Sequence, residues 1–83
     1  MTLNLTLYRR WFNQIAAGIK RIEYREIKPY WTQRIENKQY SEIHFRNGYG
    51  KHRPFMRVEY LGYTIHGKYY CLMLGDVLEI TNH

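Results

Sequence analysis

The sequence predicts an α+β protein: a small, mostly antiparallel β-barrel of about five to six strands, with one main helix and one short helix packed at the barrel mouth. Two observations predict this class. Apolar and polar residues alternate with period two in several short segments. Tight turns containing glycine separate the later segments, which favours antiparallel pairing over a parallel doubly wound sheet. The chain has 83 residues, and we expect one domain over residues 1–83.

The first segments are expected to be a strand and then the main helix. Leu3, Leu5 and Leu7 alternate with polar residues and predict a half-buried strand. Residues 8–17 then follow a helical period, and Gly18 is well placed as the left-handed residue that ends the helix. The apolar face of this helix carries Trp11, Phe12, Ile15 and Ala16.

Two further elements surround a proline. Residues 21–27 return to period two, with Ile22 and Tyr24 on one face of a predicted strand. The opposite face carries Arg21, Glu23 and Arg25. Pro29 ends that strand and precedes a short helix over residues 30–35.

The remaining chain is expected to be loops and strands. After a polar loop over residues 37–41, Ile43 and Phe45 predict a third strand. A glycine-containing loop over residues 47–54 leads into a long strand over 55–65, whose inward set changes phase near Gly62 and predicts a bulge there. Turns at 66–67 and 75–76 are expected to lead into strands over 69–74 and 77–80.

The charge of the chain is strongly basic and uneven. The formal net charge is +6 and the pI is about 9.6. Residues 1–57 carry 12 of the 13 Lys and Arg residues but 4 of the 7 acidic ones. This polarity favours an anionic partner, RNA or a nucleotide before a membrane, because no basic amphipathic helix is present. The alternative is a solvated basic surface that only keeps the protein soluble.

The cysteine content and hydropathy indicate a cytoplasmic protein. Cys71 is the single cysteine, so it has no disulfide partner within the chain, and we expect it to be a small buried hydrophobe. No apolar run approaches the ~18 residues that a membrane-spanning helix needs. The sequence therefore favours a cytoplasmic protein with no membrane partner, and it leaves the oligomeric state open.

The most informative stretch for function is Gly18 to Arg25, which sets charges of both signs just after the end of the main helix. In a regular strand, Lys20 and Glu23 would point to opposite faces, so they meet only if Lys20 lies in the turn before the strand. Glu23 and Arg25 share a face and can flank a cleft beside the helix. A partly buried Lys–Glu pair suits acid–base chemistry, and Lys and Arg suit phosphate recognition. The alternative is a salt bridge that only joins helix to sheet.

The glycine-containing loop supplies a second set of candidates. Asn47, Tyr49, Lys51 and Arg53 combine a ring for base stacking with charges that pair phosphates, unless the loop is only a tight turn whose tyrosine covers the core. Arg10, together with Arg9, can extend the same basic patch from the exposed face of the helix, or these arginines can simply be solvated.

Trp11 and Phe12 are adjacent in the expected helix, and adjacent helical side chains point in different directions, so only one of the two is expected to lie in the core. We favour Trp11 in the core, with a position lining the cleft as the alternative. Trp31 is expected to cover one end of the barrel. The four histidines lack the spacing of metal ligands, so neither a metal nor another cofactor is expected.

Three segments resemble the ASCH family, the activating signal cointegrator homology domains of the PUA-like superfamily, and in particular its small single-domain bacterial or phage-type members. Residues 11–25, from Trp11-Phe12 through GIKRIEYR, are similar to the G-x-K-x-x-E-x-R signature at the exit of the first helix of that family. Residues 45–50, FRNGYG, resemble a loop of some small relatives, and residues 74–80, LGDVLEI, resemble the last hairpin of the family. Together these segments span nearly the whole chain.

The resemblance implies a PUA-like barrel that faces RNA or nucleotides. One branch of the family resembles acetylcytidine amidohydrolases that use a lysine, a threonine and a distant glutamate. Lys20 matches that lysine, but Glu23 stands where the branch has threonine, and no equivalent of the distant glutamate can be placed.

The sequence therefore predicts an RNA- or nucleotide-binding ASCH domain with a basic cleft beside the first helix. Lys20, Glu23 and Arg25 would form the floor of this cleft, and residues 47–53 its lid. The alternative is an enzyme, either a metal-independent ribonuclease or a nucleoside amidohydrolase, in which Lys20, Glu23 and Tyr49 are the catalytic candidates.

Overall fold

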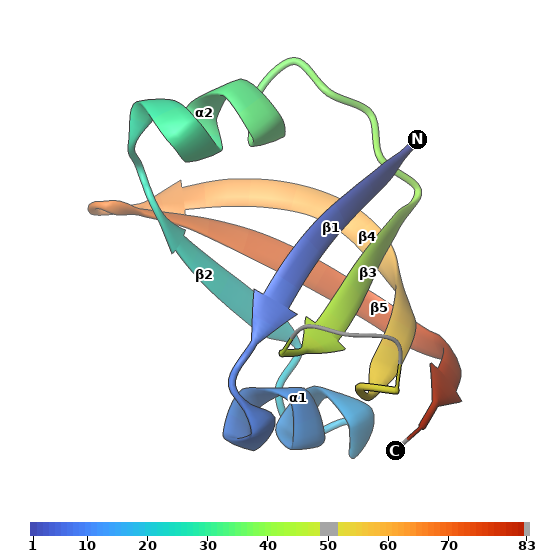
Figure 1. The fold of residues 1–83 in the computed structure, drawn as a ribbon. Coiled ribbons are helices and arrows are strands. Elements are labelled where there is room, and N and C mark those ends of the chain that lie inside the picture. Colours follow the sequence, from blue (N-terminus) through green and yellow to red (C-terminus); the bar gives the residue numbers. More distant parts are fainter. Residues whose placement is uncertain (49–51, 83) are drawn as a thin grey trace.

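The computed structural model describes residues 1–48 and 52–82, in which a curled sheet forms a half-barrel with a helix at each end (Figure 1). The described elements follow the order β1 (Thr2–Leu7), α1 (Arg9–Ala16), β2 (Ile22–Glu26), α2 (Pro29–Ile35), β3 (Glu42–Asn47), β4 (Phe55–His66) and β5 (Tyr69–Thr81). The predicted α+β class and the small barrel with one main and one short helix are confirmed.

The strands are ordered β1-β3-β4-β5-β2, so β1 and β2 form the two edges of the described sheet. Most neighbouring strands are antiparallel, but β1 and β3 are parallel, with Leu3 beside Ile43 and Leu5 beside Phe45. The sheet is mostly antiparallel, as predicted, and the β1–β3 pair is parallel because its connection is long. It runs through α1, β2 and α2, and such a crossover allows parallel pairing.

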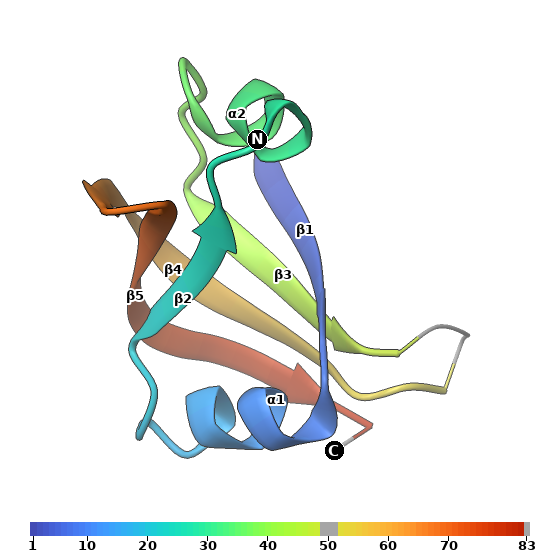
Figure 2. The same ribbon diagram turned by 90° about the vertical axis from the view of Figure 1, so that its left-hand side faces the viewer.

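The helices lie at opposite ends of the half-barrel, as both views show (Figure 2). At one end, Phe12 and Ile15 of α1 are buried beneath the sheet. At the other end, the buried hydroxyl of Tyr70 in β5 donates to the Glu36 carboxylate and accepts a hydrogen bond from Thr32 at 2.7 Å. Burial raises the pKa of Tyr70, so this phenol stays protonated and anchors α2 to the sheet.

The core joins alternate residues of the strands to the inner faces of both helices. Its fully buried side chains are Phe12, Ile15, Ile35, Ile43, Phe45, Met56, Val58, Tyr70 and Leu72. Cys71 is buried as expected. The bulge expected near Gly62 is confirmed, since Gly62 has φ of 110° and the β4–β5 register shifts between Tyr60 and Gly62.

One predicted turn is wrong. Gly75 and Asp76 do not separate two strands, because β5 continues from Tyr69 to Thr81. Val58 pairs with Val77 and Tyr60 with Leu74, so the two residues stand in a bulge of a continuous strand. The Glu59 side chain packs directly against Gly75, where a Cβ would lie 2.1 Å from its Oε1 atom, which explains the glycine at this point.

Candidate nucleic-acid interface

Arg25 bridges β1 and β2, the two edge strands of the half-barrel, and we call the gap between these strands the seam. Its Nη2 atom lies 3.4 Å from the backbone oxygen of Thr6 in β1 and 2.8 Å from Oε2 of Glu23 in β2. The Arg25 side chain is 17% exposed. A guanidinium suits this position because its fixed fork of donors can serve a carbonyl and a carboxylate together.

Lys20 reaches the same carboxylate from the turn that follows α1. Gly18 has φ of 77°, and the Gly18 and Ile19 amides donate to the carbonyls of Ile15 and Gln14, which is a glycine C-cap of the Schellman type. The chain therefore turns back before β2 begins. This turn places Nζ of Lys20 3.3 Å from Oε1 of Glu23, so the expected position of Lys20 before the strand is confirmed.

Glu23 is consequently a buried carboxylate held between two cations. The residue is 7% exposed, and it carries the charged face of β2 inward, whereas Tyr24 is 50% exposed on the other face. The expectation that Glu23 and Arg25 share a face is correct. Burying an ion costs several kcal/mol unless charges of opposite sign compensate it, and Lys20 and Arg25 supply that compensation.

Aromatic rings surround the Lys20 end of this cluster. Nζ of Lys20 lies 5.3 Å from the centroid of the Trp11 ring and 5.2 Å from that of the Tyr24 ring. The guanidinium carbon of Arg10 lies 4.8 Å from the Trp11 ring centroid. A depression of about 320 Å³ opens here, which we call the Glu23 hollow; it is lined by Trp11, Lys20, Glu23 and Tyr24.

A second depression of about 520 Å³ opens at the seam. We call it the Arg25 hollow; it is lined by Thr6, Leu7, Tyr8, Arg9, Arg25, Asn47 and Gly48. Trp31 of α2 contacts Arg25, with 4.9 Å between the guanidinium carbon and the ring centroid. The Glu23–Arg25 hydrogen bond connects the linings of the two hollows.

The described part of the 47–53 loop borders the Arg25 hollow. The side-chain amide nitrogen of Asn47, Nδ2, donates to the backbone oxygen of Leu7 at 3.0 Å, and this bond ties the loop to the end of β1. Gly48 has φ of 84°, and a Cβ there would lie 3.6 Å from Nε of Arg53, so the Arg53 side chain passes over this glycine. Tyr49 and Lys51 lie outside the described residues.

The structure thus divides the expected cleft. Lys20 and Glu23 line one hollow, while Arg25 and Asn47 line the other. The three residues predicted to form a single floor are therefore shared between two hollows, and they are linked by the ion pairs that Glu23 makes with Lys20 and Arg25. The favoured position of Trp11 in the core is wrong, because Trp11 is 37% exposed and lines the Glu23 hollow while Phe12 is fully buried.

Sequence reasoning did not assign Tyr24 or Trp31 to the site. Their signal was present, since Tyr24 stands between Glu23 and Arg25, and Trp31 follows the proline that starts α2. Successive side chains of a strand point to opposite faces, so Tyr24 must point outward if Glu23 and Arg25 on either side of it point inward.

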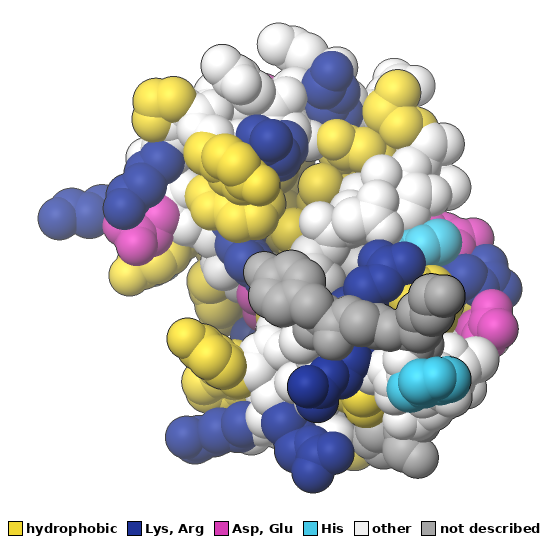
Figure 3. Space-filling view, viewed as in Figure 1, with side chains coloured by type: hydrophobic (Ala, Val, Ile, Leu, Met, Phe, Trp, Pro, Cys, Tyr) yellow, Lys and Arg dark blue, Asp and Glu magenta, His cyan; other side chains and the backbone are white. Residues whose placement is uncertain are grey.

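The face seen in Figure 3 carries Lys and Arg side chains from the α1 end to the α2 end, with hydrophobic side chains among them and fewer acidic ones.

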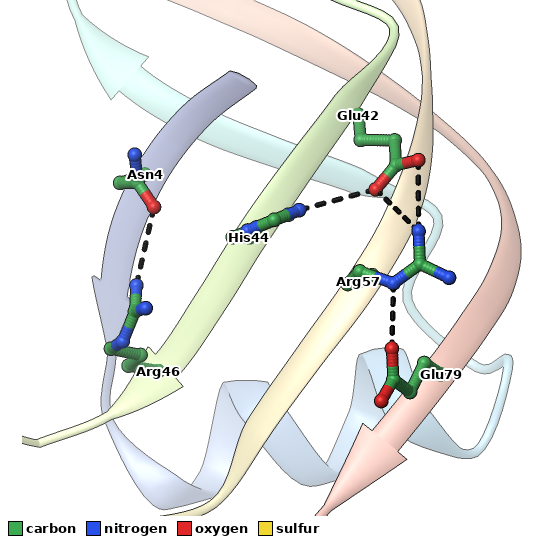
Figure 4. Close-up of polar contacts among 6 residues, drawn as sticks. All are labelled: Asn4, Glu42, His44, Arg46, Arg57 and Glu79. Atoms are coloured by element: carbon green, nitrogen blue, oxygen red, sulfur yellow. Dashed lines mark hydrogen bonds and ion pairs between the residues drawn. The ribbon is translucent and has the colours of Figure 1, made fainter. Parts of the chain in front are cut away.

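A separate polar network crosses the outer face of the sheet (Figure 4). Nη1 of Arg57 donates to both oxygens of Glu42 at 2.9 Å, and Nε donates to Glu79 at 2.7 Å. The His44 ring lies 3.1 Å from Glu42. Hydrogen bonds from His44 and from Arg57 hold the pKa of Glu42 below its ordinary value. Through Arg57, the network joins β3, β4 and β5.

No three His, Cys, Asp or Glu side chains come together as metal ligands within residues 1–48 and 52–82. In the same part of the chain, neither helix is long and apolar enough to cross a membrane.

Comparisons with protein-family models, with curated proteins and with solved structures find no match to this chain.

Proposed function

We propose that this protein binds single-stranded RNA or a nucleotide across the Glu23 and Arg25 hollows, as expected of an ASCH-like domain. One observation carries the proposal: cations that line two adjoining hollows lie against aromatic rings, Lys20 near Trp11 and Tyr24 and Arg25 near Trp31. Proteins that bind single strands combine these two features, because cations follow the phosphates and rings stack on the bases.

The two hollows suit different parts of a nucleotide. The Arg25 hollow carries Arg9 and Arg25, and Arg53 passes over Gly48 at its border, so phosphate oxygens fit there. The Glu23 hollow has the exposed rings of Trp11 and Tyr24, so a base fits there. The hydrogen bond between Glu23 and Arg25 sets the two sites side by side.

Binding is tested by the fluorescence anisotropy of labelled single-stranded RNA. Arg9→Ala is expected to weaken binding several-fold, and the affinity is expected to fall as salt rises, since each phosphate contact releases counterions. Lys68→Ala is the matched control, because it removes one exposed charge at the β4–β5 turn, away from both hollows. Equal losses in the two variants, or affinity independent of salt, would contradict the proposal.

Trp11 and Trp31 are the two tryptophans of the chain, and both border the proposed surface. Stacking of a base should therefore quench the intrinsic fluorescence of the protein. Trp11→Ala is expected to weaken RNA binding about tenfold, in line with about 1–3 kcal/mol for each stacked base.

Catalysis is the alternative role of the same site. The Lys20–Glu23 ion pair, 3.3 Å long and facing a hollow, is the observation that favours it. Incubation with labelled RNA or with an acylated nucleoside, in the presence of a chelator, separates the roles. Products that form with the unaltered protein and disappear in Lys20→Ala would show an enzyme, whereas intact substrate favours binding alone.

A further inference from the structure

The Glu23 hollow combines two aromatic rings with a hydrogen-bond acceptor and a hydrogen-bond donor. Trp11 and Tyr24 offer ring surfaces, Glu23 offers carboxylate oxygens, and Lys20 offers an ammonium group beside Oε1. We propose, resting on the proposed function, that this hollow selects guanine among the RNA bases.

Glu23 retains the capacity to accept hydrogen bonds from a ligand. An ionised carboxylate has about four acceptor sites and no donor. Among the described residues, Lys20 contacts Oε1 and Arg25 contacts Oε2, which leaves further acceptor sites on both oxygens. Both cations also fix the orientation of the carboxylate, so the acceptors are held in place before a ligand arrives.

Lys20 supplies the complementary donor. Its ammonium group has three donors, and one of them faces Glu23 at 3.3 Å. The Lys20 side chain is 15% exposed, so its position is restricted by Trp11 and Tyr24. A ligand edge that meets both groups therefore needs N–H donors opposite Glu23 and an oxygen or nitrogen acceptor opposite Lys20.

Guanine matches this edge better than the other bases. Its ring N–H and its amino group are adjacent donors, which suit a carboxylate, and its O6 is an acceptor beside them. Adenine, cytosine and uracil each place a single donor group next to an acceptor, so each forms fewer bonds with the same pair. A donor pair on a charged acceptor discriminates by about tenfold or more.

The experiment uses uridine oligomers that differ at one central base, with anisotropy as the readout. A central guanine is expected to bind about tenfold more tightly than adenine or cytosine. Inosine lacks only the amino group of guanine, so it should lose most of this advantage. The comparison between guanine and inosine changes the ligand alone, and it is therefore independent of how any variant folds.

A protein variant gives the second arm. Glu23→Gln keeps the side-chain shape but replaces one acceptor oxygen with a donor, so the ratio of the guanine affinity to the adenine affinity should fall towards one. Equal binding of all oligomers by the unaltered protein would overturn guanine selection and leave RNA binding intact. If no oligomer binds, both proposals fail.

Discussion

The guanidinium of Arg25 joins the two edges of the sheet, because one nitrogen lies 3.4 Å from the Thr6 carbonyl of β1 and 2.8 Å from the Glu23 carboxylate of β2. The half-barrel is therefore held at its seam by a side chain where a closed barrel would have a ladder of backbone hydrogen bonds. The same side chain lines the Arg25 hollow, so the closure of the fold and the candidate site share one residue.

Arg25→Met should destabilise the protein by roughly 2–4 kcal/mol, since removal of one partner leaves the buried Glu23 carboxylate undercompensated. Urea unfolding measures the change. Arg21→Met is the control, because the Arg21 side chain is 58% exposed and its contact with Asp76 is 4.0 Å long, so its effect should stay within about 0.5 kcal/mol. Similar costs for the two variants would show that Arg25 does not hold the seam.

Alanine substitutions of the adjacent residues Phe12 and Trp11 should have different effects, the first mainly on stability and the second mainly on RNA binding. Phe12→Ala should cost about 3–5 kcal/mol, because its ring is fully buried between α1 and the sheet. Trp11→Ala should cost about 1 kcal/mol, since the ring is partly exposed, and its main effect should be on RNA affinity. Urea unfolding and anisotropy on the same samples check both expectations, and a larger stability loss for Trp11→Ala would contradict them.

The hydroxyl of Tyr60 is buried and has no hydrogen-bond partner among the described residues. Tyr60→Phe should therefore leave stability at neutral pH unchanged or raise it slightly, because an unpaired buried hydroxyl costs free energy. A loss of more than about 1 kcal/mol would indicate a partner for this hydroxyl.

The titration of Tyr60 provides a separate test. Burial raises its pKa to about 12, above the unfolded value near 10. The folded state therefore favours the neutral phenol, and this contribution is present below about pH 10 and lost as pH rises through about 12. The stability of Tyr60→Phe should therefore fall less steeply with rising pH in that alkaline range than the stability of the unaltered protein, as measured by circular dichroism.

Glu42 should make the outer network sensitive to acid. His44 and Arg57 hold the pKa of Glu42 low, so its contribution is present above the ordinary glutamate value of about 4.3 and is lost as pH falls through the lower folded value. Glu42→Gln should lower the urea midpoint at neutral pH, and the difference should vanish in acid. Glu26→Gln, at an exposed ion pair with Lys28, should change little at either pH.

Local patterns predicted most of the elements. Alternation located β1 and β3, the helical period located α1, and Gly18 marked its end, because these features depend on neighbours within a few residues. Gly75 and Asp76 were misassigned as a turn, since a glycine at a bulge and a glycine at a turn look alike until the partner strand is known. The parallel pairing of β1 with β3 also depends on strands far apart in the sequence.

The candidate site shows the same division. The sequence by itself determined that Lys20 precedes β2 and that Glu23 and Arg25 share a face, because glycine geometry and the period of a strand are local. Only the tertiary structure decided that Arg25 reaches Thr6, that Trp11 lies outside the core, and that Trp31 covers Arg25. Those contacts join residues from different elements, and their distances are set by how the sheet curls and where each helix packs against it.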